Sequence, residues 1–119
     1  MKKYLGVLIL FLTLSAQAQK LSDQFKVKDY AKQQTEMIQS ALDLDQATTD
    51  QVYQANLSKA YAIHKRILLL EYNKKINGQN LDQVIKEVKD VVERDSGYLE
   101  SMEKILGEEK FTAYKEKFQ

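Results

Sequence analysis

The residue types that most often carry acid–base chemistry or bind metals are scarce in this chain. His64 is the single histidine, and there is no cysteine. A lone histidine could act as a base or as a metal ligand, but no second soft ligand stands at helical spacing from it. A histidine on the apolar side of a helix is more typical of a packing residue whose ring nitrogen finds a local partner. We therefore expect His64 to pack, and we expect neither a metal nor a cofactor.

The acidic residues and the glycines do not form a catalytic motif either. Carboxylate pairs such as Asp43 with Asp45, or Glu108 with Glu109, are adjacent or point in different directions on a helix, and they lack an EF-hand arrangement. The glycines are isolated, so there is no glycine-rich phosphate loop. Catalysis needs groups with complementary roles brought together. The sequence therefore predicts a protein that is not an enzyme.

Tyrosine is the informative side chain, because several tyrosines recur on one side of the apolar stretch from 46 to 76. One row of this stretch holds Val52, Ala55, Ile63, Ile67 and Leu70, and a second row holds Tyr53, Leu57, Tyr61, His64, Leu68 and Tyr72. At about 100° per residue, the two rows cover more than half of a helix circumference, which is wider than the usual amphipathic stripe. Such a helix needs neighbours on two sides.

The second row supplies the candidate face for a client or partner protein. Its members are Tyr53, Leu57, Tyr61, Leu68 and Tyr72. Tyrosine combines a large apolar area with a polar tip, which suits a face that must tolerate water until something binds. The alternative is that another helix of the same chain covers this face as part of the core. The sequence leaves both possibilities open.

Hydrophobic periodicity predicts an all-α fold, an elongated antiparallel helical hairpin or bundle of about four helices. Two long helices are expected at 46–76 and 81–106, and two flanking helices at 23–42 and 108–118. Asp45 can cap the start of the central helix, and Gly78 can end it. From Leu81 to Leu106 the apolar residues are spaced alternately four and three apart, which predicts packing at a shallow angle against the central helix.

One position of this seam is polar. Asp95 is followed by Ser96 and Gly97, and glycine inside a helix costs about 1 kcal/mol relative to alanine. The segment is either a hinge or polar break that fixes the register, or a stretch in which the stripe drifts and Asp95 reaches solvent. We favour the second interpretation.

The N-terminal residues predict export. Lys2 and Lys3 precede an apolar run from Leu5 to Leu14 and an Ala-x-Ala pattern that ends at Ala18, which is typical of a secretory signal peptide. About ten apolar residues are too few to anchor the chain across a bilayer of roughly 30 Å. We therefore expect cleavage after Ala18 and a periplasmic or secreted product, a single helical domain over 19–119 with no integral membrane segment. The formal net charge is +1, and it becomes −1 once Lys2 and Lys3 are removed. This near-neutrality with interspersed signs argues against binding to nucleic acid.

Two segments at predicted helix starts carry degenerate copies of an LTxxQ pattern. The first is Leu44-Asp45-Gln46-Ala47-Thr48 and the second is Leu106-Gly107-Glu108-Glu109-Lys110, followed by Phe111 and Tyr114. Asp45 and Gly107 stand in the Thr place, and Thr48 and Lys110 stand in the Gln place. With these segments the chain resembles the Spy/CpxP-like family of small periplasmic helical proteins. The resemblance implies a helical, often dimeric cradle that binds unfolded or partly folded proteins without ATP.

Two hypotheses of function follow. The first is an exported, ATP-independent, chaperone-like protein that binds unfolded or partly folded envelope proteins through the tyrosine-bearing face, as in an envelope stress response. The second is a structural or regulatory interaction protein whose apolar face is a permanent interface, either in a homodimer or with one partner. A small-ligand carrier with a cavity between its helices is a third and less favoured alternative.

Overall fold

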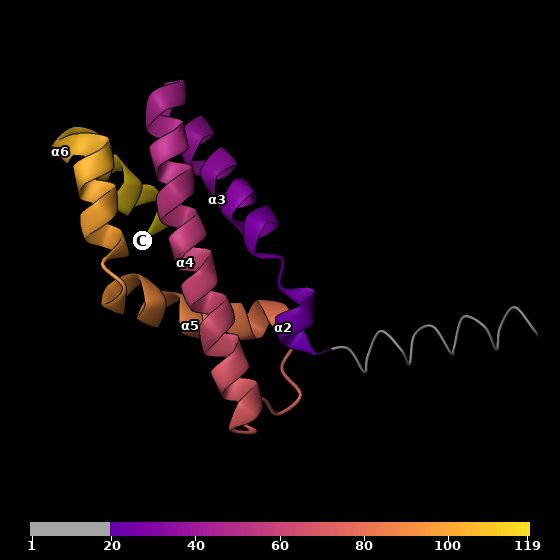
Figure 1. Cartoon of the computed structure of the whole chain (residues 1–119). Helices are drawn as coiled ribbons and strands as arrows, with labels where there is room; N and C mark the ends of the chain where they lie inside the picture. The colour runs from indigo at the N-terminus through magenta and orange to yellow at the C-terminus, as the bar shows by residue number, and fades with distance from the viewer. Residues whose placement is uncertain (1–19) are drawn as a thin grey trace, which may run out of the picture.

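The computed structural model describes residues 20–119, and this part of the chain is all-α, with no strand. Its helices are α2 (Leu21–Gln24), α3 (Val27–Leu42), α4 (Gln46–Tyr72), α5 (Leu81–Asp95) and α6 (Tyr98–Phe118) (Figure 1). The predicted all-α bundle is confirmed in its class and general arrangement, while several of the predicted helix bounds need correction. The predicted signal peptide, residues 1–18, lies outside the described residues.

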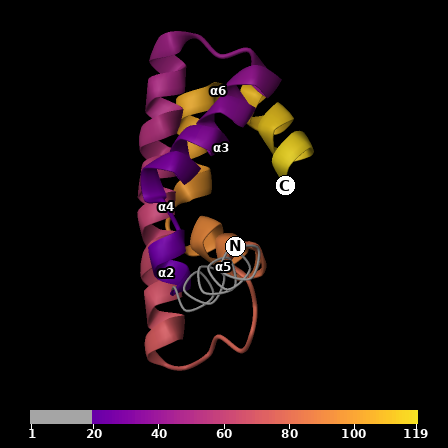
Figure 2. The same ribbon diagram turned by 90° about the vertical axis from the view of Figure 1, so that its right-hand side faces the viewer.

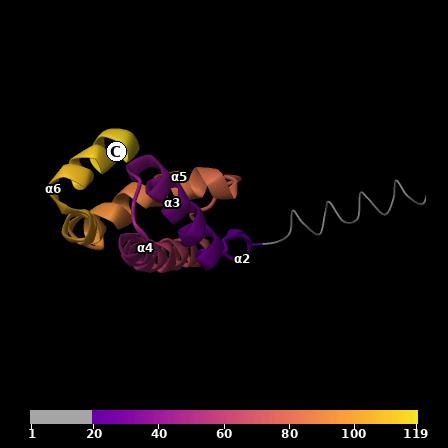
Figure 3. The ribbon, with the colours of Figure 1, turned by 90° about the horizontal axis from the view of Figure 1, so that it is seen from above.

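Helix α4 is the element against which the other helices lie. Figure 1 shows α3 beside the upper half of α4, α5 crossing its lower half, and α6 on the side away from α3. Turned by 90°, the molecule has α4 along one edge, with α3, α5 and α6 all on the same side of it (Figure 2). The view from above shows α4 again at an edge, with α2 next to it (Figure 3).

Two hydrophobic cores follow one another along the inner side of α4. The first, which we call the α6 core, joins α3, α4 and α6 through Ile38, Leu42, Leu44, Val52, Tyr98, Met102, Leu106, Phe111 and Tyr114. The second, the α5 core, joins the N-terminal helices to α4 and α5 through Phe25, Ala31, Ala60, Ile63, Ile67, Val84, Val88 and Val92. Because α4 contributes to both cores, much of its wide apolar circumference is used in folding.

The predicted helix 81–106 is two helices, because the chain breaks at Ser96 and Gly97. Gly97 has a φ of 75°, in the left-handed region that favours glycine, and it directly precedes α6. Asp95 is exposed at the end of α5, so it reaches solvent as we favoured, but the helix also ends there. As a result α5 and α6 run in different directions rather than forming one long arm antiparallel to α4 (Figure 1).

A second break separates the last helical segment from the rest of α6. Gly107 has non-helical angles, with φ 82° and ψ 168°, so residues 108–118 form a distinct arm, as the sequence predicted. Phe111 and Tyr114 bury this arm in the α6 core. The rings of Tyr114 and Phe118 stack with their centroids 5.3 Å apart. The arm thereby folds back toward α3, where Nζ of Lys117 donates to the carbonyl of Ala41 over 3.0 Å.

The central helix starts as predicted and ends earlier. Asp45 caps it, since Oδ1 of Asp45 accepts a hydrogen bond of 2.8 Å from the backbone N–H of Thr48. The predicted end at residue 76 is wrong, because α4 stops at Tyr72 and Lys74 takes a φ of 55°. The N–H of Lys75 then donates to the carbonyl of Leu70 over 2.8 Å, which closes the helix before Gly78 is reached.

The predicted first helix, 23–42, is also divided. The chain is extended at Phe25 and Lys26, between α2 and α3. Phe25 is buried in the α5 core, where its ring lies 5.2 Å from that of Tyr30. Burial of this ring accounts for the interruption, because a continuous helix would carry the side chain in another direction. The short α2 is thereby held against α4.

Candidate functional site

The structure divides the predicted client face of α4 into a covered part and an open part. Tyr53 and Leu57 are half-buried and pack against the α5 core. The other three members are exposed, with 54% of Tyr61, 46% of Leu68 and 85% of Tyr72 open to solvent. The chain's own helices therefore cover Tyr53 and Leu57, whereas Tyr61, Leu68 and Tyr72 stay open to solvent.

Leu69 extends the open part, since 48% of it is exposed. We call Tyr61, Leu68, Leu69 and Tyr72 the exposed apolar face of α4. Leu68, Leu69 and Tyr72 follow Tyr61 by seven, eight and eleven positions, which are close to two or three full turns, so the four residues lie on one side of the C-terminal half of the helix. Isolated exposed apolar residues are common on proteins, but four large ones gathered on one helix suggest a binding surface.

A shallow groove runs beside this face, where α5 crosses α4. It has a volume of about 320 Å³ and is lined by Ala62, Lys65, Arg66, Leu69, Val91, Val92, Asp95 and Ser96. Its lining combines apolar side chains from both helices with the charged side chains of Lys65, Arg66 and Asp95. The exposed apolar face therefore continues into a depression that an apolar side chain of another molecule could enter.

His64 is a packing residue, as the sequence analysis favoured. Its Nε2 lies 3.1 Å from the carbonyl oxygen of Ser22, and its ring stacks on Phe25 with the centroids 6.2 Å apart. Ser22 and Phe25 are both buried. The imidazole thus helps to hold α2 against α4. In residues 20–119 no group of three or more His, Cys, Asp or Glu side chains is placed to hold a metal ion.

The two LTxxQ-like segments have different roles at the two ends of the α6 core. Leu44 is buried, and Asp45 and Thr48 form the cap of α4. The hydrogen bond from the Thr48 N–H holds the pKa of Asp45 below its ordinary value. In the second segment Leu106 is buried, but Lys110 is exposed and the glycine at 107 has no side chain to cap the arm.

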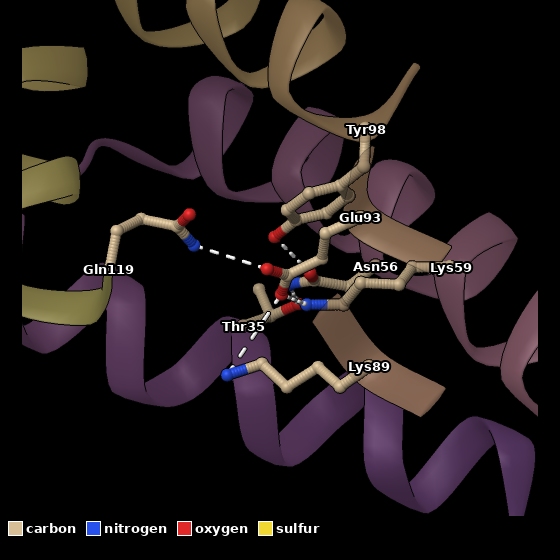
Figure 4. A network of polar contacts seen from close by, with 7 residues as sticks. All are labelled: Thr35, Asn56, Lys59, Lys89, Glu93, Tyr98 and Gln119. Atoms are coloured by element: carbon tan, nitrogen blue, oxygen red, sulfur yellow. Dashed lines mark hydrogen bonds and ion pairs between the residues drawn. The ribbon is translucent and has the colours of Figure 1, made fainter. Parts of the chain in front are cut away.

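A polar network lies in the interior, between the two cores, and sequence reasoning missed it (Figure 4). Tyr98 donates a hydrogen bond of 2.6 Å to Oδ1 of Asn56, and Nδ2 of Asn56 donates to Oγ1 of Thr35 over 3.0 Å. Thr35 in turn donates to the carbonyl of Ala31 over 2.7 Å. Asn56, Thr35 and Tyr98 are all buried. One chain of hydrogen bonds therefore connects α3, α4 and α6.

The same network contains a buried ion pair between α4 and α5. Nζ of Lys59 lies 3.1 Å from Oε1 of Glu93, and only 1% and 5% of the two side chains are exposed. The Lys59 ammonium also sits over the ring of Tyr98, 4.1 Å from its centroid. Gln119 donates to the other oxygen of Glu93 over 3.1 Å, and Lys89 lies 4.0 Å from the first. Both charges therefore have partners (Figure 4).

The surroundings of this network shift the acidity of its members in opposite senses. Burial lowers the pKa of Lys59, although the nearby Glu93 carboxylate acts to raise it. Burial raises the pKa of Tyr98, and outside the network it also raises the pKa of Tyr30, to about 12. A small cavity of about 210 Å³ reaches Lys59 and Tyr98 from the side of the Ser96 break. The ammonium and carboxylate engage one another, so the arrangement is that of a structural contact between helices.

A signal for this network was present in the sequence. Positions 52, 56, 59, 63 and 67 form the inner stripe of α4, and two of these five are polar, Asn56 and Lys59. Polar residues at regular positions of an apolar stripe predict buried partners on neighbouring helices. Glu93 is harder to identify, because it neighbours Val92 in a segment rich in exposed charge.

Comparisons of the chain with protein-family models, with curated proteins and with solved structures found no match. Among residues 20–119 there is no helix long and apolar enough to cross a membrane.

Proposed function

We propose that this protein is an exported, ATP-independent, chaperone-like protein that binds unfolded or partly folded envelope proteins. The binding surface is the exposed apolar face of α4 together with the groove beside it. The observation that supports this proposal is the exposure of Tyr61, Leu68, Leu69 and Tyr72 on one half of a single helix. Export rests on the signal-peptide pattern of residues 1–18, and the resemblance to the Spy/CpxP-like family points to the same function.

The chemistry of the face suits transient binding of chains without one fixed sequence. Tyrosine and leucine offer apolar contact to many side chains, and the tyrosine hydroxyl keeps the face compatible with water between binding events. The groove between α4 and α5 adds Lys65 and Arg66, whose long stems can cover apolar surface while their charges stay in water. Such a surface favours exposed apolar segments over a single defined ligand.

The face is also separate from the interactions that hold the fold. The opposite side of α4 carries Val52, Ile63 and Ile67, which are fully buried in the two cores. Exposed side chains contribute little to folding stability, usually within about 0.5 kcal/mol of zero on substitution. The exposed apolar face can therefore be altered without unfolding the bundle, which makes its function testable.

The decisive variant is the triple substitution Tyr61→Gln, Leu68→Gln and Tyr72→Gln. We expect it to keep the helicity and melting temperature of the wild type by circular dichroism. We also expect it to lose the ability to suppress aggregation of a chemically denatured model protein, followed by light scattering without ATP. Met37→Gln is the matched control, because Met37 is 49% exposed but lies on α3.

Two results would count against the proposal. A wild-type protein that gives no suppression even at molar excess would remove the chaperone function and leave the permanent-interface hypothesis. Early melting of the triple variant would show that the three residues are needed for packing, since burial of such side chains is worth about 2–5 kcal/mol each. Equal loss of suppression in the Met37→Gln control would show that the effect is not specific to α4.

A further inference from the structure

Positive charge is concentrated in the part of the chain that carries the exposed apolar face of α4. Residues 61–80 hold four basic residues and one acidic residue, which is a formal charge of +3. Residues 20–60 and 81–119 together hold 12 basic and 16 acidic residues, which is a formal charge of −4. The described part of the chain is therefore strongly asymmetric in charge, although its total charge is close to zero.

The four basic residues, which we call the basic cluster, are accessible to an outside partner. Its members, all exposed, are Lys65, Arg66, Lys74 and Lys75. None of the four takes part in an ion pair with another residue of 20–119. The acidic residue of the segment, Glu71, is half-buried. Asp95 also lines the groove beside the face, but its Oδ1 already lies 3.3 Å from Nε of Arg94. The positive charge of the basic cluster is therefore not neutralised by the fold.

Two members of the basic cluster lie on α4 itself, together with the exposed apolar face. Lys65 follows Tyr61 by four positions and precedes Leu68 by three, so it lies on the same side of the helix. Arg66 lines the groove that runs beside the face. Both side chains are long enough to keep their apolar stems against the face while their charged groups reach a polar layer.

The other two members lie at the end of the molecule. Lys74 and Lys75 come just after α4, and the N–H of Lys75 donates to the carbonyl of Leu70 over 2.8 Å, which holds this turn against the last turn of the helix. Figures 1 and 2 show the C-terminal end of α4 and the loop after it extending beyond α2 and α5. A broad, flat partner can therefore approach this end of the molecule.

We propose that the exposed apolar face and the basic cluster together bind the surface of a lipid bilayer that contains anionic phospholipids. The leucine side chains of the face enter the boundary between head groups and acyl chains, where tyrosine can keep its ring in apolar and its hydroxyl in polar surroundings. The ammonium and guanidinium groups meet the phosphates of the head groups. In this arrangement the C-terminal half of α4 lies on the bilayer.

Charge favours this partner over the other candidates. An anionic surface attracts the basic cluster and repels the acidic remainder of the chain, so it turns the apolar face toward the lipid. The same surface of a second copy would bring like charges together, and an unfolded chain of mixed charge would give no such orientation. The inference goes beyond the proposed function, because it places the protein at a membrane whether or not it binds clients there.

Sedimentation with lipid vesicles tests the chemistry of the partner. The exported product should bind vesicles of phosphatidylcholine mixed with phosphatidylglycerol, and it should bind vesicles of pure phosphatidylcholine far more weakly. A basic residue near an anionic surface contributes about fivefold in affinity, so Lys74→Gln with Lys75→Gln should weaken binding to the anionic vesicles roughly 30-fold. Lys104→Gln with Lys110→Gln is the matched control, because it removes the same charge from exposed positions of α6.

Tryptophan fluorescence tests which surface meets the lipid, because the chain has no tryptophan of its own. Tyr72→Trp introduces the reporter in the exposed apolar face, where Tyr72 is 85% exposed. Met37→Trp introduces it at an exposed position of α3 and serves as the control. With anionic vesicles, the emission of the Tyr72→Trp variant should shift to shorter wavelength, and that of the Met37→Trp variant should not. A shift in both variants or in neither would contradict the assigned surface.

Other outcomes would overturn the inference as well. Equal binding of the wild type to neutral and anionic vesicles would show that the basic cluster does not meet head-group phosphates. Equal weakening by the two pairs of lysine substitutions would show the same for Lys74 and Lys75. A mass of two chains in solution, without binding to either kind of vesicle, would assign the apolar face to a second copy.

The lysine variants also separate this inference from the proposed function. Lys74 and Lys75 lie outside the exposed apolar face, so the variant that lacks both should still suppress aggregation when no lipid is present. Vesicle binding by a wild type that gives no suppression would reject the chaperone function and leave the membrane surface intact. Suppression by a wild type that binds no vesicles would reject the membrane surface and leave the function.

Discussion

Replacement of Glu93 by leucine should destabilise the fold strongly, because it leaves the ammonium of Lys59 without its carboxylate. The two groups are 3.1 Å apart, and their side chains are 1% and 5% exposed. At an effective dielectric constant of about 20, their attraction is about 5 kcal/mol. Loss of one partner of a buried pair typically costs about 3–5 kcal/mol, a large part of the roughly 5–15 kcal/mol that stabilises a small domain.

The loss should depend on pH in a defined direction. Burial lowers the pKa of Lys59 from its ordinary value of 10.5, and Glu93 opposes this shift, so Glu93→Leu lowers the pKa of Lys59 further. At pH values between the lowered pKa of Lys59 in the folded chain and its ordinary pKa in the unfolded chain, Lys59 is protonated in the unfolded chain only. The free energy of unfolding therefore rises with pH in that window. The destabilisation of Glu93→Leu should accordingly be smaller at pH 9 than at pH 7.

Urea unfolding followed by circular dichroism at both pH values measures these effects, with the m-value as a check on two-state behaviour. The double variant Lys59→Met, Glu93→Leu is the control, because replacing both partners by apolar residues is often neutral or stabilising. We expect a coupling free energy of several kcal/mol in the resulting cycle. One contrary result is that the stability losses of the single variants Lys59→Met and Glu93→Leu simply add up in the double variant, and another is that each loss is below about 1 kcal/mol. Either result would show that the ion pair does not contribute as described.

Further predictions concern the core, the buried phenols and export. Val92→Asp should cost several kcal/mol by placing an unpaired charge in the α5 core, whereas Asp95→Leu, at the exposed end of α5, should change stability by less than about 0.5 kcal/mol in thermal melts. Tyr98→Phe should cost about 1–3 kcal/mol by leaving a buried amide oxygen unpaired. Because burial raises the pKa values of Tyr98 and Tyr30, the latter to about 12, their contribution to stability should be full below pH 10 and lost progressively above it, as alkaline unfolding would measure. Mass spectrometry of the protein from an envelope fraction should show loss of residues 1–18, and a retained N-terminal methionine with membrane association would contradict export.

The class of the fold could be predicted because hydrophobic periodicity is a strong signal over long segments. The same signal misjudged the helix between 81 and 106. The four-and-three spacing of buried positions continues across Gly97. Val92 before the break and Met102 after it are both buried, but each lies in a different core. A periodic pattern reports that positions are buried, but it does not report that they are buried against one partner.

The ends of α4 show the same contrast between local and spatial information. The cap at Asp45 is local chemistry between residues three apart, so it could be predicted from the sequence. The early end at Tyr72 could not, because Lys74 takes a left-handed conformation in which glycine is more usual. The prediction relied on Gly78 as the residue that ends the helix, so it placed the end four residues too far along the chain.

The candidate site was predictable in its composition and not in its extent. All five residues of the predicted face lie on one side of α4, but whether each is covered depends on the placement of α2 and α3. Tyr53 and Leu57 pack against the α5 core, and Tyr61 and Tyr72 do not. Helix propensity does not show how far along α4 a neighbouring helix extends. The boundary of the exposed part could therefore be determined only from the structure.

The polar network explains how α4 can have an uncommitted outer side. Asn56 and Lys59 sit between the two cores and contact one residue on each neighbouring helix, namely Thr35 on α3, Glu93 on α5 and Tyr98 on α6. Hydrogen bonds are directional, so a slip of any of these helices along α4 would leave a buried group unpaired. The inner side thereby sets the position of every long helix. The outer side then contributes little to the fold, and its residues are available for contacts with other molecules.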